Sequence, residues 1–111
     1  MTNPNRRKGD AFERALVAYF REHGFPYAER AYGAGRPDDV GDLDGVGALC
    51  VSAKDCGTAR LPEWLAEVED QRERGRKRLG VVIWKRRRRP IGETYVVMTL
   101  ASFCELVRED G

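Results

Sequence analysis

The stretch GDLDGVGALCVSAK, residues 41–54, decides the fold. Asp-Gly at 44–45 marks a tight turn between a short strand, residues 39–43, and a longer one, residues 46–54. Side chains alternate between the two faces of a strand, which groups Leu49, Val51 and Ala53 on one face and Cys50, Ser52 and Lys54 on the other. The first face suits a core. The second therefore carries Lys54 towards whatever covers the sheet.

Apolar periodicity predicts three helices around these strands. The first runs from Asp10 to His23 and ends at Gly24. The second begins at Leu61-Pro62 and ends at Gly75 or in the stretch near Gly80, and the third follows a Thr99 cap. Further strands are expected at 27–32, 79–84 and 93–98, and the strongly apolar segment 79–84 is expected to be central. The predicted order is helix, three strands, helix, two strands, helix, which is an α/β arrangement. Cys50 and Cys104 fall in apolar patterns and are interpreted as core residues, not as nucleophiles.

Length and composition favour one domain. The chain has 111 residues, and we expect a disordered tail at 1–8 followed by a single domain at 9–111. No apolar run approaches the roughly 20 residues of a membrane span, and the N-terminus lacks the apolar stretch of a signal peptide. Three cysteines without Cys-x-x-Cys spacing fit a reducing cytoplasm and argue against structural zinc.

Charge is unevenly distributed although the net charge is only +2. Lys85, Arg86, Arg87, Arg88 and Arg89 form one basic run, and a second lies at 72–78. Acidic residues gather at 38–44 and 63–73. A basic face of this kind can hold a phosphate backbone without reading sequence. The alternative is that the 85–89 run is a solvated hairpin tip. Its arginines would then reflect only the chain's general use of arginine over lysine.

Asp42 and Lys54 are the residues best placed for chemistry. A carboxylate at the end of one strand and a lysine on the next can converge on one face of a hairpin. Asp42 offers the hard oxygen that Mg²⁺ prefers, and Lys54 can offset charge on a phosphate. Glu13, beside the apolar Phe12, can reach the same ion from the first helix. The alternatives are a turn-capping Asp42, a solvated Lys54 and an exposed Glu13.

Residues 8–108 resemble the small Holliday junction resolvase-like nucleases of actinobacteria and their phages, which belong to the restriction endonuclease-like PD-(D/E)xK superfamily. The matching motifs are Lys8-Gly9, Phe12-Glu13, Glu29-Arg30, Gly33 to Gly35, Gly41 to Gly45, Ala53-Lys54-Asp55, Leu61 to Glu69 with Trp64, and Val81 to Arg87.

The resemblance implies a central mixed five-stranded sheet flanked by helices, in the order αβββαββα. It also implies a homodimer that hydrolyses phosphodiester bonds of branched, Holliday junction-like DNA with Mg²⁺, for which Mn²⁺ can substitute. Glu13 and Asp42 would be metal ligands, Lys54 the catalytic lysine and Gln71 an assisting residue. DNA contacts are expected from Arg30 and Arg36 as well as from the 85–89 run.

The chain departs from this pattern at one position, because Ser52 stands where the (D/E)-x-K motif has an acid. A hydroxyl is a weaker Mg²⁺ ligand than a carboxylate. A carboxylate from elsewhere can substitute, with Glu67 the best candidate and Asp44 another. Alternatively, Glu13 and Asp42 suffice while Ser52 holds a water. In the third alternative the protein binds DNA on the same fold without cutting it efficiently.

Overall fold

The computed structural model describes residues 4–31 and 41–109, with side chains at 9–31 and 41–108. Within these residues the elements are α1 (Pro4–Glu22), β1 (Glu29–Arg30), β2 (Leu43–Asp44), β3 (Leu49–Lys54), α2 (Leu61–Arg74), β4 (Leu79–Trp84), a short 3-10 helix η1 (Ile91–Glu93), β5 (Tyr95–Val97) and α3 (Leu100–Glu109). The predicted order of helices and strands is confirmed. No helix of the described part is long and apolar enough to cross a membrane.

The strands form two sheets, so the prediction of one five-stranded sheet is wrong. Strands β1 and β2 pair antiparallel, while β3, β4 and β5 form a mixed sheet in that order. In the mixed sheet β3 and β4 are parallel, and β4 and β5 are antiparallel. Segment 79–84 is therefore the central strand, as predicted. The expected hairpin of 39–43 with 46–54 is also wrong, because β2 pairs with β1 and not with β3. We call the β1–β2 pair the hairpin; at Asp42 it is bonded to β3 through one backbone bond and one carboxylate bond.

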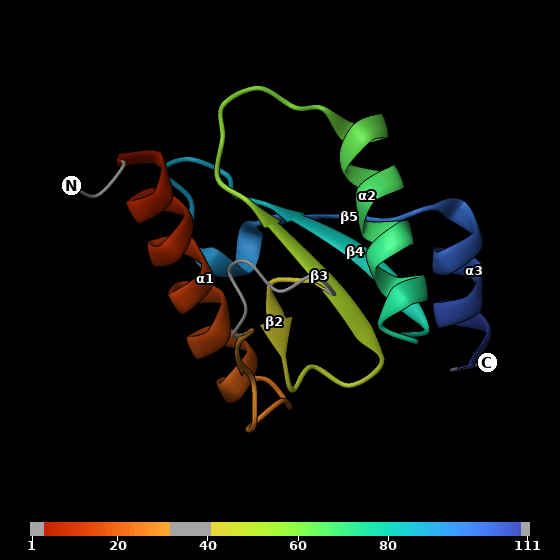
Figure 1. The fold of residues 1–111 in the computed structure, drawn as a ribbon. Coiled ribbons are helices and arrows are strands. Elements are labelled where there is room, and N and C mark those ends of the chain that lie inside the picture. Colours follow the sequence, from red (N-terminus) through yellow and green to blue (C-terminus); the bar gives the residue numbers. More distant parts are fainter. Residues whose placement is uncertain (1–3, 32–40, 110–111) are drawn as a thin grey trace.

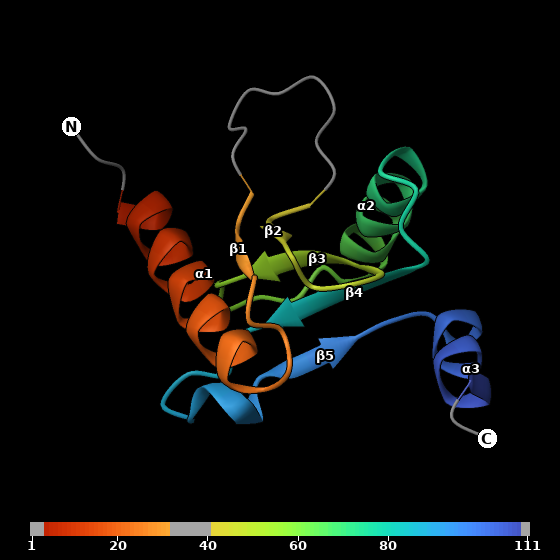
Figure 2. The same ribbon diagram turned by 90° about the horizontal axis from the view of Figure 1, so that it is seen from below.

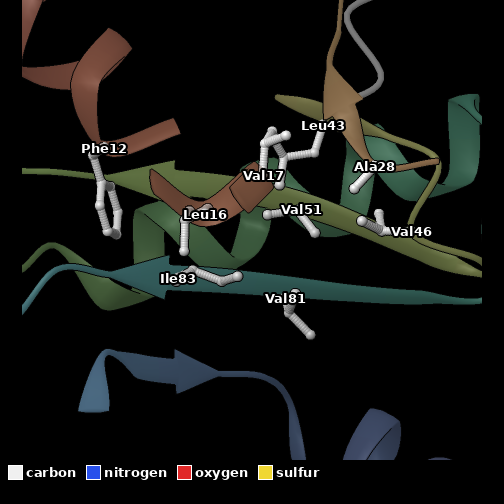
Figure 3. Close-up of a cluster of buried hydrophobic side chains, with 9 residues drawn as sticks. All are labelled: Phe12, Leu16, Val17, Ala28, Leu43, Val46, Val51, Val81 and Ile83. Atoms are coloured by element: carbon white, nitrogen blue, oxygen red, sulfur yellow. The ribbon is translucent and has the colours of Figure 1, made fainter. Parts of the chain in front are cut away.

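Two helices cover opposite faces of the mixed sheet (Figure 1). On one face, α1 side chains pack on β3 and β4 around Val51, and the hairpin completes this core through Ala28 and Leu43 (Figure 3). On the other face, α2 packs through Trp64 and Val68 on Cys50 and Val82. Strand β3 thus sends Val51 to one helix and Cys50 to the other, which confirms the predicted alternation. Lys54 shares the parity of Cys50 and faces α2.

Helix α2 connects the parallel strands β3 and β4 and lies close to β4 at Gly80. A Cβ at Gly80 would lie 3.2 Å from the carbonyl oxygen of Val68 and 2.9 Å from Oε2 of Glu69. The absence of a side chain therefore lets the helix approach the strand. This close approach is made beside Cys50, which pairs with Gly80, while Lys54 at the other end of β3 meets Trp64 and Glu67 of α2.

The first helix begins earlier than predicted. The expected disordered tail covered residues 1–8, but α1 is helical from Pro4 onward. Proline suits the first turn of a helix because its φ is already helical and its missing N–H is not needed there. The apolar stripe of α1 appears as expected, with Phe12 and Leu16 buried against the sheet.

The last helix is held at its start by the predicted cap. The backbone N–H of Ser102 donates to Oγ1 of Thr99 at 3.1 Å. Figure 2 shows β5 leading to α3 at the end of the molecule away from α1. The interpretation of Cys104 as a core residue is wrong, because its side chain is exposed while Ser102 is buried. The apolar pattern of α3 is present, but it faces outward.

Candidate functional site

Hydrogen bonds to both the hairpin and β3 hold Asp42 in place. Its backbone N–H donates to the Val51 carbonyl at 2.8 Å, and its carbonyl accepts from Ala31 at 2.9 Å. Its carboxylate oxygen Oδ2 accepts the backbone N–H of Ala53 at 2.7 Å. The preceding Gly41 has φ +113°, and a Cβ there would lie 3.1 Å from the Val51 carbonyl oxygen. Local backbone geometry therefore holds this carboxylate against the residue that directly precedes Lys54.

Lys54 ends β3 and reaches across to α2. Its Nζ lies 3.6 Å from Oε1 of Glu67 and 5.9 Å from the centre of the Trp64 ring. The same Glu67 oxygen accepts a weak hydrogen bond from Nε2 of Gln71 at 3.5 Å. Glu63, Glu67 and Gln71 follow one another at four-residue spacing, so they share one side of α2. The ammonium is thus oriented by one carboxylate and one aromatic face.

Ser52 points to the same side of β3 as Lys54, but it is only 2% exposed. It stands two residues before Lys54 and pairs across the parallel ladder with Val82. Residue 52 therefore lies in the packed layer between β3 and α2. A carboxylate at residue 52 would have to be buried there, which is costly without a partner charge. Glu67 is instead half exposed at the edge of α2. Of the two substitutes considered from sequence, Glu67 is the one that contacts Lys54.

Glu13 is held on the other side of the sheet by Arg30. Arg30 Nε donates to Oε1 of Glu13 at 3.0 Å, and its Nη2 donates to Oδ1 of Asp10 at 2.6 Å. Burial opposes the charge of Arg30, but the bonds and charges of Glu13 and Asp10 outweigh it and raise the pKa of Arg30. The guanidinium therefore stays charged at every assay pH. Asp10 was not singled out from the sequence, although its i,i+3 spacing to Glu13 is a usable signal.

The position of Glu13 bears on its predicted role as a metal ligand. Arg30 pairs with Leu43 across the hairpin, and Leu43 faces the core beneath α1. Asp42 lies just before β2, and its carboxylate is bonded to Ala53 of β3. Glu13 is bonded to Arg30 through Oε1 on the side of the sheet that α1 covers. That ligand role stays a prediction.

The 85–89 basic run follows β4 at the Lys54 end of the sheet. The backbone N–H of Lys85 donates to the carbonyl of Lys54 at 3.0 Å, and the Trp84 indole donates to the Cys56 carbonyl at 2.8 Å. The basic loop therefore lies beside the loop that follows Lys54. Its cations are not equivalent. Lys85, Arg86 and Arg89 are within 4 Å of a carboxylate of Asp55 or Glu93, and Arg87 and Arg88 are exposed.

Arg36, the remaining predicted DNA contact, lies outside the described residues. Within the described part, no group of three or more His, Cys, Asp or Glu side chains is arranged to hold a metal ion. Mg²⁺ commonly binds through one or two carboxylates together with waters and substrate phosphates. Asp42 and Glu67 carry carboxylate oxygens of the chemical kind that such coordination uses.

Comparisons with protein-family models, with curated proteins and with solved structures find no match for this chain. The resemblance to junction resolvase-like nucleases therefore rests on the order and spacing of its short motifs.

Proposed function

We propose that the protein is a Mg²⁺-dependent endodeoxyribonuclease that acts on branched or otherwise structured DNA, with a restriction endonuclease-like core and as a homodimer. One observation carries the proposal. The carboxylate of Asp42 is bonded to the backbone of Ala53, next to Lys54, and Lys54 in turn contacts a carboxylate from α2. Asp42 and Lys54 thus lie on neighbouring segments, and Glu67 adds a second acid beside the lysine. Such a set of two acids and a lysine is suited to phosphodiester hydrolysis.

Each residue of this set has a distinct role. Asp42 and Glu67 supply oxygen ligands, and Glu67 takes the place of the strand carboxylate that Ser52 lacks. A bound Mg²⁺ supplies Lewis acidity towards the phosphate and makes water more acidic. Lys54 offsets negative charge that builds up on the phosphate. Its contact with Glu67 and the Trp64 ring restricts where the ammonium can lie, which lowers the entropic cost of using it.

The basic loop supplies binding energy for the phosphate backbone. Arg87 and Arg88 project into solvent at the same end of the sheet as Lys54. Contacts from such cations position a duplex without reading its sequence. Preference for branched DNA would then come from the arrangement of two subunits on the strands.

A cleavage assay tests the proposal with four-way, flapped and linear DNA in Mg²⁺ and in Mn²⁺. Asp42→Asn, Lys54→Met and Glu67→Gln should each lower the cleavage rate by about 10²-fold or more, as loss of a charge-stabilising group does. Glu63→Gln is the matched control, since Glu63 lies one turn from Glu67 and pairs with Arg60 at the same 3.6 Å. The control should cleave like the parent. Full activity in Asp42→Asn would overturn the proposal.

A second function is favoured by the burial of Ser52 and by the engagement of Glu13 with Arg30. Both leave the site with fewer available carboxylates than the superfamily pattern has. On this alternative the protein binds structured DNA and does not cut it. Salt-sensitive binding, with no product from any substrate in either metal, would establish the alternative. A protein that neither binds nor cuts DNA would exclude both functions.

A further inference from the structure

One row of side chains crosses the mixed sheet at the end where Lys54 lies. Lys54 of β3 pairs in register with Trp84 of β4, and Trp84 pairs with Tyr95 of β5. Residues directly opposite one another on paired strands point to the same face of a sheet, so this row faces the α2 side. The row therefore leads from Lys54 to the outer edge of the sheet, where β5 lies (Figure 2).

Beyond Lys54 the row is aromatic, and its outer end is open to solvent. The ring centres of Trp84 and Tyr95 are 5.3 Å apart, and Trp64 of α2 meets Trp84 edge-on at 5.8 Å. Trp84 is partly buried against the core beneath α2. Tyr95 contacts Trp84 but remains 45% exposed. The aromatic row thus belongs to the core at Trp64 and to the surface at Tyr95.

Cations accompany the exposed end of this row. The guanidinium carbon of Arg86 lies 4.9 Å from the centre of the Tyr95 ring. The Arg87 guanidinium is beside Gly57, where its Nη2 would lie 3.6 Å from a Cβ. Glu93 faces Arg86 at 3.8 Å with about half of its side chain exposed, and surface ion pairs of this kind contribute little to stability. A phosphate can therefore take the place of Glu93 beside Arg86.

Trp84 is held rigidly, and it restricts Tyr95 in turn. Its indole N–H donates to the carbonyl of Cys56 at 2.8 Å, and its ring is packed against Trp64. The Tyr95 ring then has Trp84 on one neighbouring strand and Arg86 above it. Because these contacts already restrict the ring, little conformational entropy is lost when a ligand stacks on it.

We propose that Tyr95, Trp84 and Arg86 form a stacking subsite for an unpaired base of single-stranded DNA, whose phosphates lie along the 85–89 run. Exposed rings interleaved with cations suit single strands, because every base has a π-face and every nucleotide carries a phosphate. A base inside an intact duplex is already stacked on its neighbours and does not expose its face. The subsite therefore selects a nucleotide that is unpaired, as at a flap, a gap or a branch point.

The inference rests on the proposed function, for which it names the substrate class: duplex DNA that carries unpaired nucleotides. Neighbouring strands of a sheet lie about 4.8 Å apart, so Tyr95 is roughly 10 Å from Lys54 across the sheet. A base stacked on Tyr95 then belongs to a nucleotide close along the strand to the phosphate that Lys54 meets. The subsite would place the cleavage point next to the unpaired nucleotide.

Equilibrium binding in EDTA tests the subsite without cleavage. Fluorescence anisotropy compares a blunt duplex with the same duplex carrying a short thymidine flap, and we expect the parent to bind the flapped DNA more tightly. Tyr95→Ala should weaken binding of the flapped DNA by about five- to a hundredfold, the range for one stacked base, and leave the blunt duplex unaffected. Tyr95→Phe keeps the ring and should bind like the parent. Val96→Ala is the matched control, because Val96 is 60% exposed on the opposite face of β5.

Three further readouts separate stacking from a merely structural role of Tyr95. A flap of abasic nucleotides keeps the phosphates without the bases, so the parent should bind it no better than the blunt duplex. Tyr95→Ala should leave the slope of log binding constant against log salt unchanged, because no phosphate contact is lost. An unpaired 5-iododeoxyuridine in the flap should photo-cross-link to Tyr95, as located by mass spectrometry. Circular dichroism would verify that every variant is folded.

The failure of the subsite and the failure of the proposed function have different signatures. Equal binding of the flapped DNA by the parent and Tyr95→Ala, an equal loss in Val96→Ala, or a smaller salt slope in Tyr95→Ala would overturn the subsite. Tight binding of the abasic flap, or a cross-link outside Tyr95 and Trp84, would also overturn it. Each of these results leaves cleavage by the parent intact. Full cleavage by Asp42→Asn would overturn the proposed function alone, and a protein that binds no DNA would overturn both.

Discussion

Replacing Asp42 by alanine and by asparagine separates its structural role from its chemical role. The Oδ2 atom accepts the Ala53 N–H at 2.7 Å, a short bond to a charged acceptor at the edge of β3. Hydrogen bonds to charged groups contribute about 1.5–3 kcal/mol to stability. Asp42→Ala removes the acceptor altogether. Because the site is half buried, water replaces it only in part, and we expect a loss of about 2 kcal/mol.

Asparagine keeps an oxygen where the carboxylate oxygen stood. Asp42→Asn should therefore retain the Ala53 bond in neutral form and lose less than about 1 kcal/mol of unfolding free energy. Urea denaturation measures both variants. With a slope of roughly 1–3 kcal/mol per molar urea, Asp42→Ala should lower the midpoint by about 1 M, with the slope unchanged.

The pair of variants gives a clear refutation. Equal midpoints for Asp42→Ala and Asp42→Asn would show that the bond to Ala53 does not hold β3 to the hairpin. The reasoning would also fail if the alanine variant were as stable as the parent. If the asparagine variant is stable but cleaves no DNA, the charge of Asp42 acts in chemistry, whereas the oxygen acts in folding.

Three further predictions concern the packing of α2, the cap of α3 and the basic loop. Gly80→Ala should lower stability by about 1–3 kcal/mol in thermal unfolding, because its Cβ would press on the Val68 carbonyl 3.2 Å away; an unchanged melting temperature would mean that α2 can shift freely. Thr99→Ala removes the acceptor for the Ser102 N–H and should cost about 1 kcal/mol, measured the same way, while Thr99→Ser should cost little. Arg87→Ala should reduce the slope of log binding constant against log salt by about 1 on any DNA. A slope equal to that of the unsubstituted protein would show that Arg87 does not contact the DNA.

Much of the fold was predictable because local patterns agree with the final packing. The alternation along β3 has to match one helix on each face, and it does, with Val51 under α1 and Cys50 under α2. The division into two sheets was not predictable. A carboxylate oxygen of Asp42, not a backbone carbonyl, satisfies Ala53, so the ladder stops where a side chain takes over. Strand periodicity does not show where a side-chain carboxylate takes the place of a backbone carbonyl.

The site was predictable to the extent that it depends on strand parity. Asp42 and Lys54 belong to neighbouring segments of the sequence, and the structure bonds the Asp42 carboxylate to the backbone of Ala53, the residue before Lys54. The bond between Glu13 and Arg30 joins residues 17 positions apart on different elements. Long-range ion pairs of this kind leave no local pattern. The outward orientation of α3 was missed for a related reason, because periodicity shows that a helix has an apolar side but not which surface covers it.

The burial of Ser52 and the contact of Glu67 have one physical explanation. An ionised carboxylate at residue 52 would lie in a packed layer between β3 and α2, and its desolvation would have to be offset by Lys54 or by a metal at all times. On α2, the carboxylate of Glu67 keeps half of its surface in water and still reaches Lys54. The acid is then stable without a bound metal, and the core beneath α2 stays apolar. Ser52→Glu should therefore lower the free energy of unfolding. The double variant Ser52→Glu, Glu67→Gln should cleave DNA only where Mg²⁺ also restores its folding.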